Sequence, residues 1–482
     1  MFVIALAAAS SAIAQPLQTQ FELLASEGGL SECRIGAVLM DAQTGEVLAT
    51  KDSDESFIPA SNMKLITAGT ALQILGPDFV FQTELRWDEA TGTLVVLGDG
   101  DPAFGDPKLL NEMGLSSEEF VDVWADSVAK NHIKNIKELV VDDRVFDREW
   151  VHGAWPVDQL NRWYCAEVAG INFHTNCITI YTNPSETGRP AVLETEPHSP
   201  WIELANKTRT TSRGNHAPWA ARDYQTNDIT VFGTIRFATD PLEVTIHDMP
   251  TYFGALLEHR LSIAGIEVER VRLVEKDEHL PEGEILAKVR TELPTALERV
   301  NVNSQNMYAE ALLKRVSHEM TSLSGSWTNG TAAARMVLAE RLGPAAGEEI
   351  VISDGSGMSR ENSVTPRMLA SWLRSFHGDE VFGPMLRDSM ATPGNGTLRT
   401  RFKGIQLDNN VYAKSGYLNG VSALSGYVID PDTDRTVIFV MLLNNQSSKV
   451  SRTTIKQYEE KVTDMLDDWL TEQKAGAGSF GG

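Results

Sequence analysis

Residues 59–75 read PASNMKLITAGTALQIL, and they place a serine and a lysine three residues apart at the start of an expected helix. The apolar side chains that follow recur at helical spacing; they are Leu65, Ile66, Ala68, Leu72 and Leu75. Ser61 then lies at the helix N-terminus, where free N–H groups and the helix dipole favour developing negative charge. Lys64 lies one turn further along the same face. The pattern indicates a nucleophilic serine beside an amine, although a helix-leading serine and a solvated lysine would read the same way.

The same spacing occurs again at Ser127 and Lys130, where it predicts no chemistry. This pair ends an amphipathic stretch from Glu118 to Lys130, whose apolar face is formed by Val121, Trp124, Ala125 and Val128. We expect Ser127 to be an ordinary residue on the surface of that helix. The spacing alone is therefore too common to identify an active site.

Two further short motifs follow Ser61 along the chain. Ser304-Gln305-Asn306 begins an apolar-periodic run and is expected at or near a helix start, where a plain N-cap is the alternative interpretation. Lys414-Ser415-Gly416 lies in an extended stretch, where the alternative is an edge-strand lysine followed by a turn glycine. Three motifs in this order are typical of the serine enzymes that acylate on penicillin, in which a nearby amine activates the serine.

Composition and charge exclude several classes of function. The 482-residue chain is long enough for two or three domains, and its formal net charge is −24. Nucleic acids and anionic membranes are bound through basic surfaces, so neither is an expected partner. The ten histidines are scattered, and no cysteine stands beside one at metal-ligand spacing, so we expect no metal and no other cofactor.

The N-terminal residues predict export. Residues 2–14 form an apolar run that ends in Ala12-Ile13-Ala14, similar to a secretory signal and its cleavage site, although the usual positive charge before the run is missing. We expect residues 1–14 to be removed and the protein to be periplasmic or otherwise extracytoplasmic; a buried helix or strand is the alternative. No stretch is long enough to span a membrane. In an oxidising compartment Cys165 and Cys177 could form a disulfide that contributes about 3 kcal/mol.

The expected elements indicate an α+β protein whose catalytic domain is interrupted in sequence. Strand pairs at both ends of the chain could form one antiparallel sheet flanked by helices, including a helix over about residues 453–470; these strands are Ile35–Asp41, Glu46–Lys51, Val421–Asp430 and Thr436–Asn444. This domain would comprise residues 15–75 and 286–472. Short strand patterns between turn signals dominate residues 76–285, which predicts a large, mainly β insertion of one or two subdomains. The Gly-rich residues 473–482 predict a flexible tail.

Beyond the three motifs, several segments resemble the D-alanyl-D-alanine carboxypeptidase/endopeptidase family of penicillin-binding proteins, the class C low-molecular-mass type known as peptidase family S13. They are Gly98–Pro102, Asp142–Asp147, Asp354–Asn362 and Gly396–Arg399, and Cys165 and Cys177 resemble a cysteine pair of some members. The resemblance covers nearly the whole mature chain. It departs from the family at Gln305, where aspartate is usual, and at Ser415, where threonine is usual. Ser415 keeps the hydroxyl, and Gln305 replaces a residue that is not expected to contact the substrate.

The resemblance implies a penicillin-binding, serine transpeptidase-like catalytic domain that hydrolyses a D-alanyl peptide bond through an acyl-enzyme on Ser61. Lys64 is the expected base, with its pKa lowered by burial and by the charge of Lys414. Ser304 can relay the proton to the leaving amine. The backbone N–H groups of Ser61 and Tyr417 would form the oxyanion hole.

Other residues would hold the substrate. Asn306 would bind the penultimate amide, and Lys414 and Ser415 would meet the terminal carboxylate. Gly416 would allow close approach of the substrate backbone. The resemblance also implies that Arg360 and Asp142 hold the carboxylate and the ammonium of a diamino-acid side chain.

The expected partners are peptidoglycan peptides, with β-lactam antibiotics as covalent inhibitors; the oligomeric state does not follow from the sequence. Two other functions would use the same motifs. A β-lactamase must deacylate rapidly, and we identify no additional glutamate of the kind that some of these enzymes use. A catalytically idle penicillin-binding scaffold would not need the intact Ser61, Lys64, Ser304 and Lys414.

Overall fold

The computed structural model describes residues 17–27, 30–238, 240–445 and 450–478, which fall into two compact units. The first unit comprises Met1–Pro77, Leu297–Gln305 and Gly330–Gly482, and the second comprises Asp78–Ala296 and Asn306–Asn329. Helices α6 (Leu293–Asn301) and α8 (Trp327–Leu342) each contain a boundary between the units. The expected signal segment, residues 1–14, lies outside the described residues.

The first unit is built on a five-stranded antiparallel sheet. Its strands, in spatial order, are β16 (Asn410–Leu418), β17 (Val421–Ile429), β18 (Thr436–Asn444), β1 (Arg34–Asp41) and β2 (Val47–Lys51). Every residue of β17 and β18 is buried, which fits their mostly apolar sequences and a sheet covered on both faces. Strands from both ends of the chain therefore form one sheet, as the sequence predicted.

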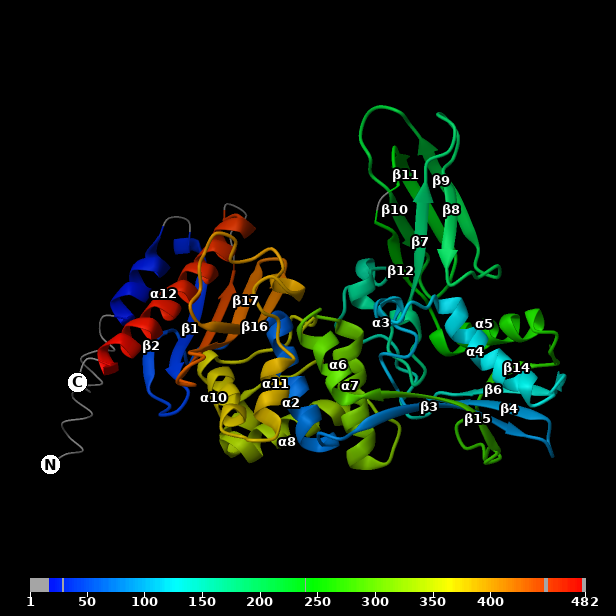
Figure 1. The fold of residues 1–482 in the computed structure, drawn as a ribbon, viewed down its shortest axis with the longest axis horizontal. Coiled ribbons are helices and arrows are strands. Elements are labelled where there is room, and N and C mark those ends of the chain that lie inside the picture. The colour runs from blue at the N-terminus through cyan, green and yellow to red at the C-terminus, as the bar shows by residue number, and fades with distance from the viewer. Residues whose placement is uncertain (1–16, 28–29, 239, 446–449, 479–482) are drawn as a thin grey trace. The chain divides into compact units, whose positions relative to one another are not determined.

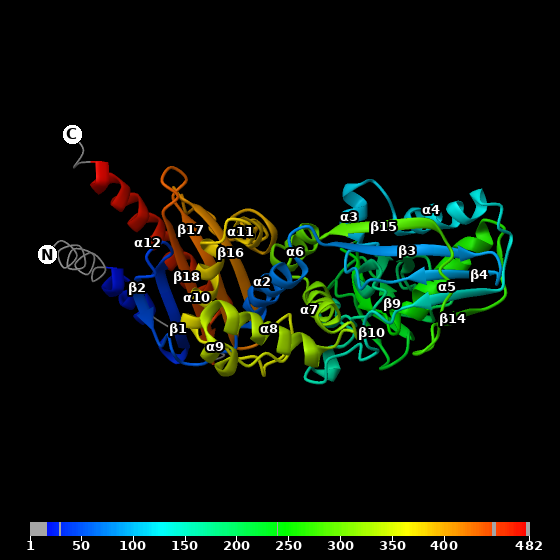
Figure 2. The ribbon, with the colours of Figure 1, turned by 90° about the horizontal axis from the view of Figure 1, so that it is seen from below.

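Helices pack on both faces of this sheet (Figures 1 and 2). The C-terminal helix α12 (Arg452–Gly478) shares an apolar core with one face of β18, to which Val437, Phe439, Met441 and Leu443 contribute. Helix α10 (Pro366–His377) contacts β1 and β18, and the Thr365 hydroxyl caps it by accepting from the Met368 N–H. The remaining helices and turns of this unit are α2 (Met63–Leu75), α9 (Pro344–Glu349), α11 (Phe382–Asp388), η1 (Leu30–Glu32), η2 (Ala60–Asn62) and η6 (Gly396–Leu398).

The second unit contains a mixed five-stranded sheet and three smaller sheets. The large sheet has the order β14 (Val271–Leu273), β6 (Glu138–Asp142), β4 (Thr93–Leu97), β3 (Val80–Asp88) and β15 (Glu284–Glu292). The smaller sheets are β10 (Trp219–Arg222), β11 (Ile229–Ile235) and β9 (Leu204–Thr210); β12 (Leu242–Thr245), β7 (Cys177–Asn183) and β8 (Val192–Glu196); and β13 (Glu267–Val268) with β5 (Asn135–Ile136). Its helices and turns are α3 (Pro107–Glu112), α4 (Ser117–Lys130), α5 (Met249–Ile263), α7 (Asn306–Thr321), η3 (Val157–Gln159), η4 (Trp163–Cys165) and η5 (His174–Asn176).

The structure differs from the sequence-based domain plan in three places. Residues 286–296, expected in the catalytic domain, belong to the second unit, in which β15 pairs with β3. Residues 306–329, expected in the catalytic domain, pack within the second unit, because α7 is buried over nearly its whole length there; Tyr308 and Leu312, for example, have no exposed surface. At the C-terminus α12 continues to Gly478, so the expected tail from residue 473 begins as helix.

The disulfide considered from the sequence is not formed. Cys165 and Cys177 are both buried thiols, and burial raises the pKa of the Cys177 thiol. Helix α4 agrees with its expected range, and Ser127 lies on it with its hydroxyl bonded to the Trp124 carbonyl, as an ordinary helical residue would.

Candidate active site

Ser61 lies in the short turn η2, directly before helix α2. The expected helix start is therefore a 3₁₀ turn that runs into the α-helix. Nζ of Lys64 donates to Oγ of Ser61 across 3.1 Å. The lysine side chain is completely buried, whereas Ser61 is half-buried. An amine held this close to the hydroxyl can accept its proton when the amine is neutral.

Lys64 makes a second contact that the sequence did not reveal. Its Nζ donates to the backbone oxygen of Ser356 across 2.7 Å, and the Thr67 hydroxyl donates to the neighbouring Gly355 oxygen. Both oxygens belong to the segment Asp354–Asn362, in which the sequence had suggested a role only for Arg360. The segment thus helps to fix the position of the Lys64 amine.

The segment Asp354–Asn362 is fixed by its own buried carboxylate. The Asp354 side chain accepts from the backbone N–H groups of Gly357 and Ser359 and from the amide of Asn362. Gly357 has a φ of +81°, and a Cβ there would lie 1.8 Å from the Ala60 oxygen. Only glycine therefore lets this segment pack against the turn that carries Ser61.

Lys414 approaches the same centre from the edge strand β16. Its Nζ donates to Oγ of Ser304 and to the Ser415 oxygen, each across 2.8 Å. Burial lowers the pKa of Lys414 well below its ordinary value, and the nearby charge of Lys64 lowers it further. The sequence argument expected the effect on Lys64; repulsion between like charges is mutual, so the pair favours states in which one amine is neutral.

Asn62, the residue after the expected nucleophile, joins the turn to the sheet. Its side-chain amide donates to the Lys414 oxygen across 2.6 Å, and its side-chain oxygen accepts from the Ser425 hydroxyl across 3.0 Å. The only sequence signal for this role was a polar side chain directly after Ser61, in a segment that is mostly apolar apart from the motif residues. Close by, a Cβ on Gly416 would lie 3.0 Å from the Ser61 nitrogen, so the observed close approach at Gly416 is to the Ser61 turn.

Ser304 occupies a strained position between α6 and α7. Its φ is +60°, a left-handed conformation that is uncommon for residues other than glycine. The preceding Val302 oxygen accepts from the Thr397 N–H across 3.0 Å, and a Cβ on Gly396 would lie 2.3 Å from that oxygen. The segment Gly396–Arg399 thus supports the backbone that presents the Ser304 hydroxyl to Lys414.

The structure brings Ser61, Lys64, Ser304 and Lys414 together within the first unit; Ser415, Gly416 and Tyr417 continue the same strand. Tyr417 has an exposed side chain with the Arg452 guanidinium 3.9 Å from the ring centroid. Arg360 is exposed and donates to the Asn419 oxygen.

Asn306 and Asp142 belong to the second unit. Asn306 begins α7, and its amide donates to the Tyr164 oxygen across 2.7 Å. Asp142 ends β6 and forms a two-pronged ion pair with Arg144. The Arg144 partner was not foreseen, and it already occupies both oxygens of the carboxylate.

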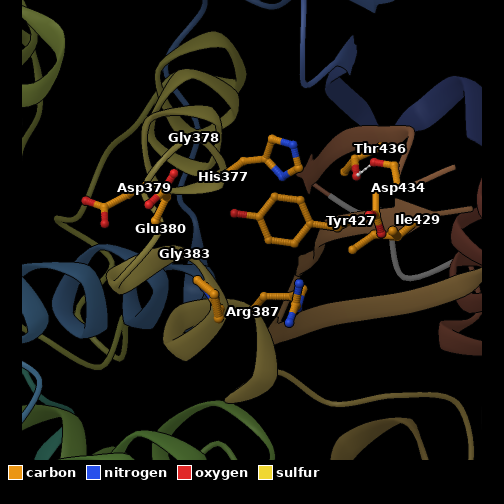
Figure 3. A pocket seen from close by; sticks show the side chains of 11 residues that line it. His377, Gly378, Asp379, Glu380, Gly383, Arg387, Tyr427, Ile429, Asp434 and Thr436 are labelled. Carbon is orange, nitrogen blue, oxygen red and sulfur yellow. Dashed lines mark hydrogen bonds between the residues drawn. The ribbon is translucent and has the colours of Figure 1, made fainter. Parts of the chain in front are cut away.

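A separate surface pocket of about 280 Å³ lies at the end of α10 and is lined by His377, Arg387 and Tyr427 among others. Figure 3 shows the Tyr427 ring between the other two side chains, and the Tyr427 hydroxyl donates to the Leu373 oxygen. No expected site residue lines this pocket.

Within the described ranges no cluster of three potential metal ligands occurs, and no helix combines the length and apolar composition of a membrane span.

The arrangement suits acyl transfer by a serine. A hydroxyl lies beside one buried amine, and a second hydroxyl lies beside another, so a proton can pass between each hydroxyl and its neighbouring amine. The turn η2 also places the Ser61 N–H close to the edge strand, where an oxyanion could be held.

Comparison with known proteins agrees with this chemistry. The model of the D-Ala-D-Ala carboxypeptidase 3 (S13) family matches residues 17–465. A D-alanyl-D-alanine carboxypeptidase of Actinomadura sp. (strain R39) is 31% identical over 453 residues, which cover 89% of this chain and 81% of the relative. The carboxypeptidase DacB of Haemophilus influenzae is 25% identical and covers 90% and 91%. The crystal structure of penicillin binding protein 4 (dacB) from Haemophilus influenzae has the same fold, with a TM-score of 0.75, 23% identity, and coverage of 92% and 99%.

Proposed function

The chain belongs to the D-Ala-D-Ala carboxypeptidase 3 (S13) family, and we propose that it is a serine-type D-Ala-D-Ala carboxypeptidase, endopeptidase or both, acting on peptidoglycan stem peptides. The observation that supports this most strongly is the pairing of two serine hydroxyls with two buried lysines, Ser61 with Lys64 and Ser304 with Lys414. Burial lowers the pKa of Lys414, and a perturbed amine beside a hydroxyl is typical of a site that activates a serine.

The reaction proceeds in two steps. The neutral amine of Lys64 takes the Ser61 proton as Oγ attacks the D-alanyl carbonyl carbon, and the negative charge on the carbonyl oxygen is held by the N–H groups of Ser61 and Tyr417. The C–N bond then breaks, and the departing amine receives a proton through Ser304, which leaves an ester on Ser61. Water hydrolyses the ester with the same groups, and the enzyme returns to its starting state.

Substrate recognition falls to the neighbouring residues. Lys414 and Ser415 would bind the terminal carboxylate, and Asn306 the penultimate amide. Arg360 would reach a side-chain carboxylate of the stem peptide. Asp142 is paired with Arg144, so an incoming ammonium would share its carboxylate with that guanidinium.

The same chemistry makes β-lactams covalent inhibitors, since their strained amide acylates Ser61. Peptidoglycan lies outside the cytoplasm, so the proposal includes an extracytoplasmic location, supported by the apolar N-terminal run.

A test uses labelled penicillin together with release of D-alanine from a soluble stem peptide. Ser61→Ala should abolish both signals with little change in unfolding free energy, and the matched variant Ser127→Ala should keep both. Covalent labelling of Ser61→Ala would disprove the assignment of the nucleophile.

The same reagents separate the two rival functions. Long-lived, stoichiometric acylation with D-alanine release supports the peptidase, whereas rapid turnover of the β-lactam identifies a β-lactamase. Labelling without any peptide hydrolysis would identify an idle penicillin-binding protein.

A further inference from the structure

We propose that the three-stranded sheet β10–β11–β9 carries a docking surface for the peptidoglycan polymer, separate from the groups that do the chemistry. The inference rests on the proposed function, because it takes the polymer to be that of the substrate. The surface, called here the basic aromatic surface, consists of Lys207, Arg209, Arg213, Trp219, Phe232 and Arg236. In Figure 1 the three strands lie together at one end of the second unit.

The two faces of this sheet differ in composition. One face enters the core of the second unit through Ile229, Val231 and Ala220, which are all buried. The alternate residues point the other way, and there Trp219, Phe232 and Lys207 stand in one row across the three strands. Nothing from the described part of the chain covers Trp219 fully, since 46% of it is exposed.

The aromatic residues of the row are already arranged as a platform. The rings of Trp219 and Phe232 are nearly parallel, with centroids 4.2 Å apart, and the Lys207 ammonium lies 5.5 Å from the Phe232 centroid. A second stacked pair, His216 and Phe237, lies at the end of the sheet, with the Arg236 guanidinium beside it. Flat, exposed rings held by their neighbours can stack on the apolar faces of sugar rings at little cost in side-chain entropy.

The charge of this surface is opposite to that of the protein. Residues 204–237 contain one lysine, four arginines and two aspartates, in a chain with a net charge of −24. The two aspartates, Asp223 and Asp228, lie in the connection between β10 and β11. The four cations of the basic aromatic surface are Lys207, Arg209, Arg213 and Arg236. All four cations are exposed, and none forms an ion pair with a described residue. Several other arginines of the second unit do form ion pairs, such as Arg260 with Asp122 and Arg272 with Glu138.

Unpaired cations next to exposed rings fit a partner that has both anionic groups and sugar rings. Peptidoglycan provides both, because its stem peptides carry carboxylates along a glycan strand. Holding the polymer would raise the local concentration of stem peptides at Ser61, without any new contact in the active site. The surface should therefore affect hydrolysis of the polymer and leave hydrolysis of short soluble peptides unchanged.

The test measures binding to purified insoluble peptidoglycan by sedimentation, in a Ser61→Ala background so that the polymer stays intact. The variant combines Trp219→Ala with Lys207→Gln and Arg209→Gln, all at exposed positions. We expect its affinity to fall about tenfold or more, and the binding of the parent protein to weaken as salt is raised. The control combines Trp201→Ala with Lys130→Gln, an exposed tryptophan and lysine of the same unit outside this surface, and should bind like the parent.

Activity measurements separate this inference from the proposed function. With Ser61 intact, the triple variant should release D-alanine from a soluble peptide at the normal rate and from insoluble peptidoglycan more slowly. If the parent protein hydrolyses neither substrate, the proposed function fails, while sedimentation still tests the surface.

Unchanged sedimentation of the triple variant would refute the docking surface. So would tighter binding of the parent to phosphatidylglycerol vesicles than to peptidoglycan, because the cations would then serve a membrane. Thermal unfolding of the triple variant must match the parent for a loss of binding to count as support.

Discussion

Replacing Asn62 by alanine should slow acylation of Ser61 although Asn62 takes no part in the chemistry. The Asn62 side chain is completely buried and connects the turn of Ser61 to two strands of the sheet. It donates to the Lys414 oxygen on β16 and accepts from the Ser425 hydroxyl on β17.

The magnitude follows from the groups left without a partner. Alanine removes two buried hydrogen bonds and leaves the Lys414 oxygen and the Ser425 hydroxyl to find new partners, at about 1–3 kcal/mol each. Relaxation reduces the sum, so the free energy of unfolding should fall by roughly 2–4 kcal/mol. A shift of the turn against β16 would move Oγ of Ser61 relative to both lysines, and misplacement by about 1 Å can lower a rate about 100-fold.

The assay measures the rate constant for acylation by labelled penicillin, together with chemical denaturation. Ser425→Ala removes only one of the two contacts and should have a smaller effect on both quantities. In a double-mutant cycle the two substitutions should couple by about 1 kcal/mol, because they share one hydrogen bond. Asn131→Ala, which removes an exposed amide-to-carbonyl bond, is the matched control and should change neither quantity. If Asn62→Ala acylates and unfolds like the parent protein, the tie between turn and sheet does not control the site.

Three further predictions concern substrate recognition and pH. Lys414→Ala should reduce activity on peptides with a free terminal carboxylate about tenfold more than acylation by an uncharged ester, since it removes a charge-assisted contact; equal losses would mean that Lys414 acts by tuning Lys64. Arg360→Ala should lower activity on peptides that contain diaminopimelate by about tenfold and spare acylation by simple penicillins; equal losses on both would make Arg360 a structural residue of its loop. Burial lowers the pKa of His174 to about 4, whereas the imidazole has its ordinary value of 6.5 in the unfolded chain. The folded protein therefore keeps its full stability above pH 6.5 and loses free energy of unfolding as pH falls towards 4, because only the unfolded chain binds the proton in this range. The unfolding free energy of the wild type minus that of His174→Gln should therefore decrease by about 3 kcal/mol over this range, as measured by denaturation at several pH values, and a flat difference would exclude His174.

Most of the local structure was predictable because it depends on short-range pattern. The terminal strand pairs, the amphipathic α4 and the helix near the C-terminus followed from periodicity, and their observed bounds differ by only a few residues from the expected ones, apart from the longer α12. Gly357 shows why other features were not predictable. Position 357 cannot carry a side chain because the Ala60 oxygen lies against it, and these two residues are distant in sequence and close only in the folded chain.

The division into units shows the same limit. The apolar periodicity of α7 predicted a helix correctly, but periodicity carries no information about which surface a helix buries. The side chains of α7 pack in the second unit, where the buried Lys314 forms an ion pair with the half-buried Asp147. The motif residues Ser304 and Asn306 therefore fall in different units.

The sequence by itself determined the family, the α+β class and the three motifs, because these depend on residue identity and spacing along the chain. Tertiary structure alone decided how the motifs work together. The bond from Lys64 to Ser356 joins residues 292 positions apart, and the bond from Lys414 to Ser304 joins residues 110 positions apart. Those contacts arise because buried polar groups must find partners among whichever segments the packed core brings close, and no spacing rule along the chain encodes that choice.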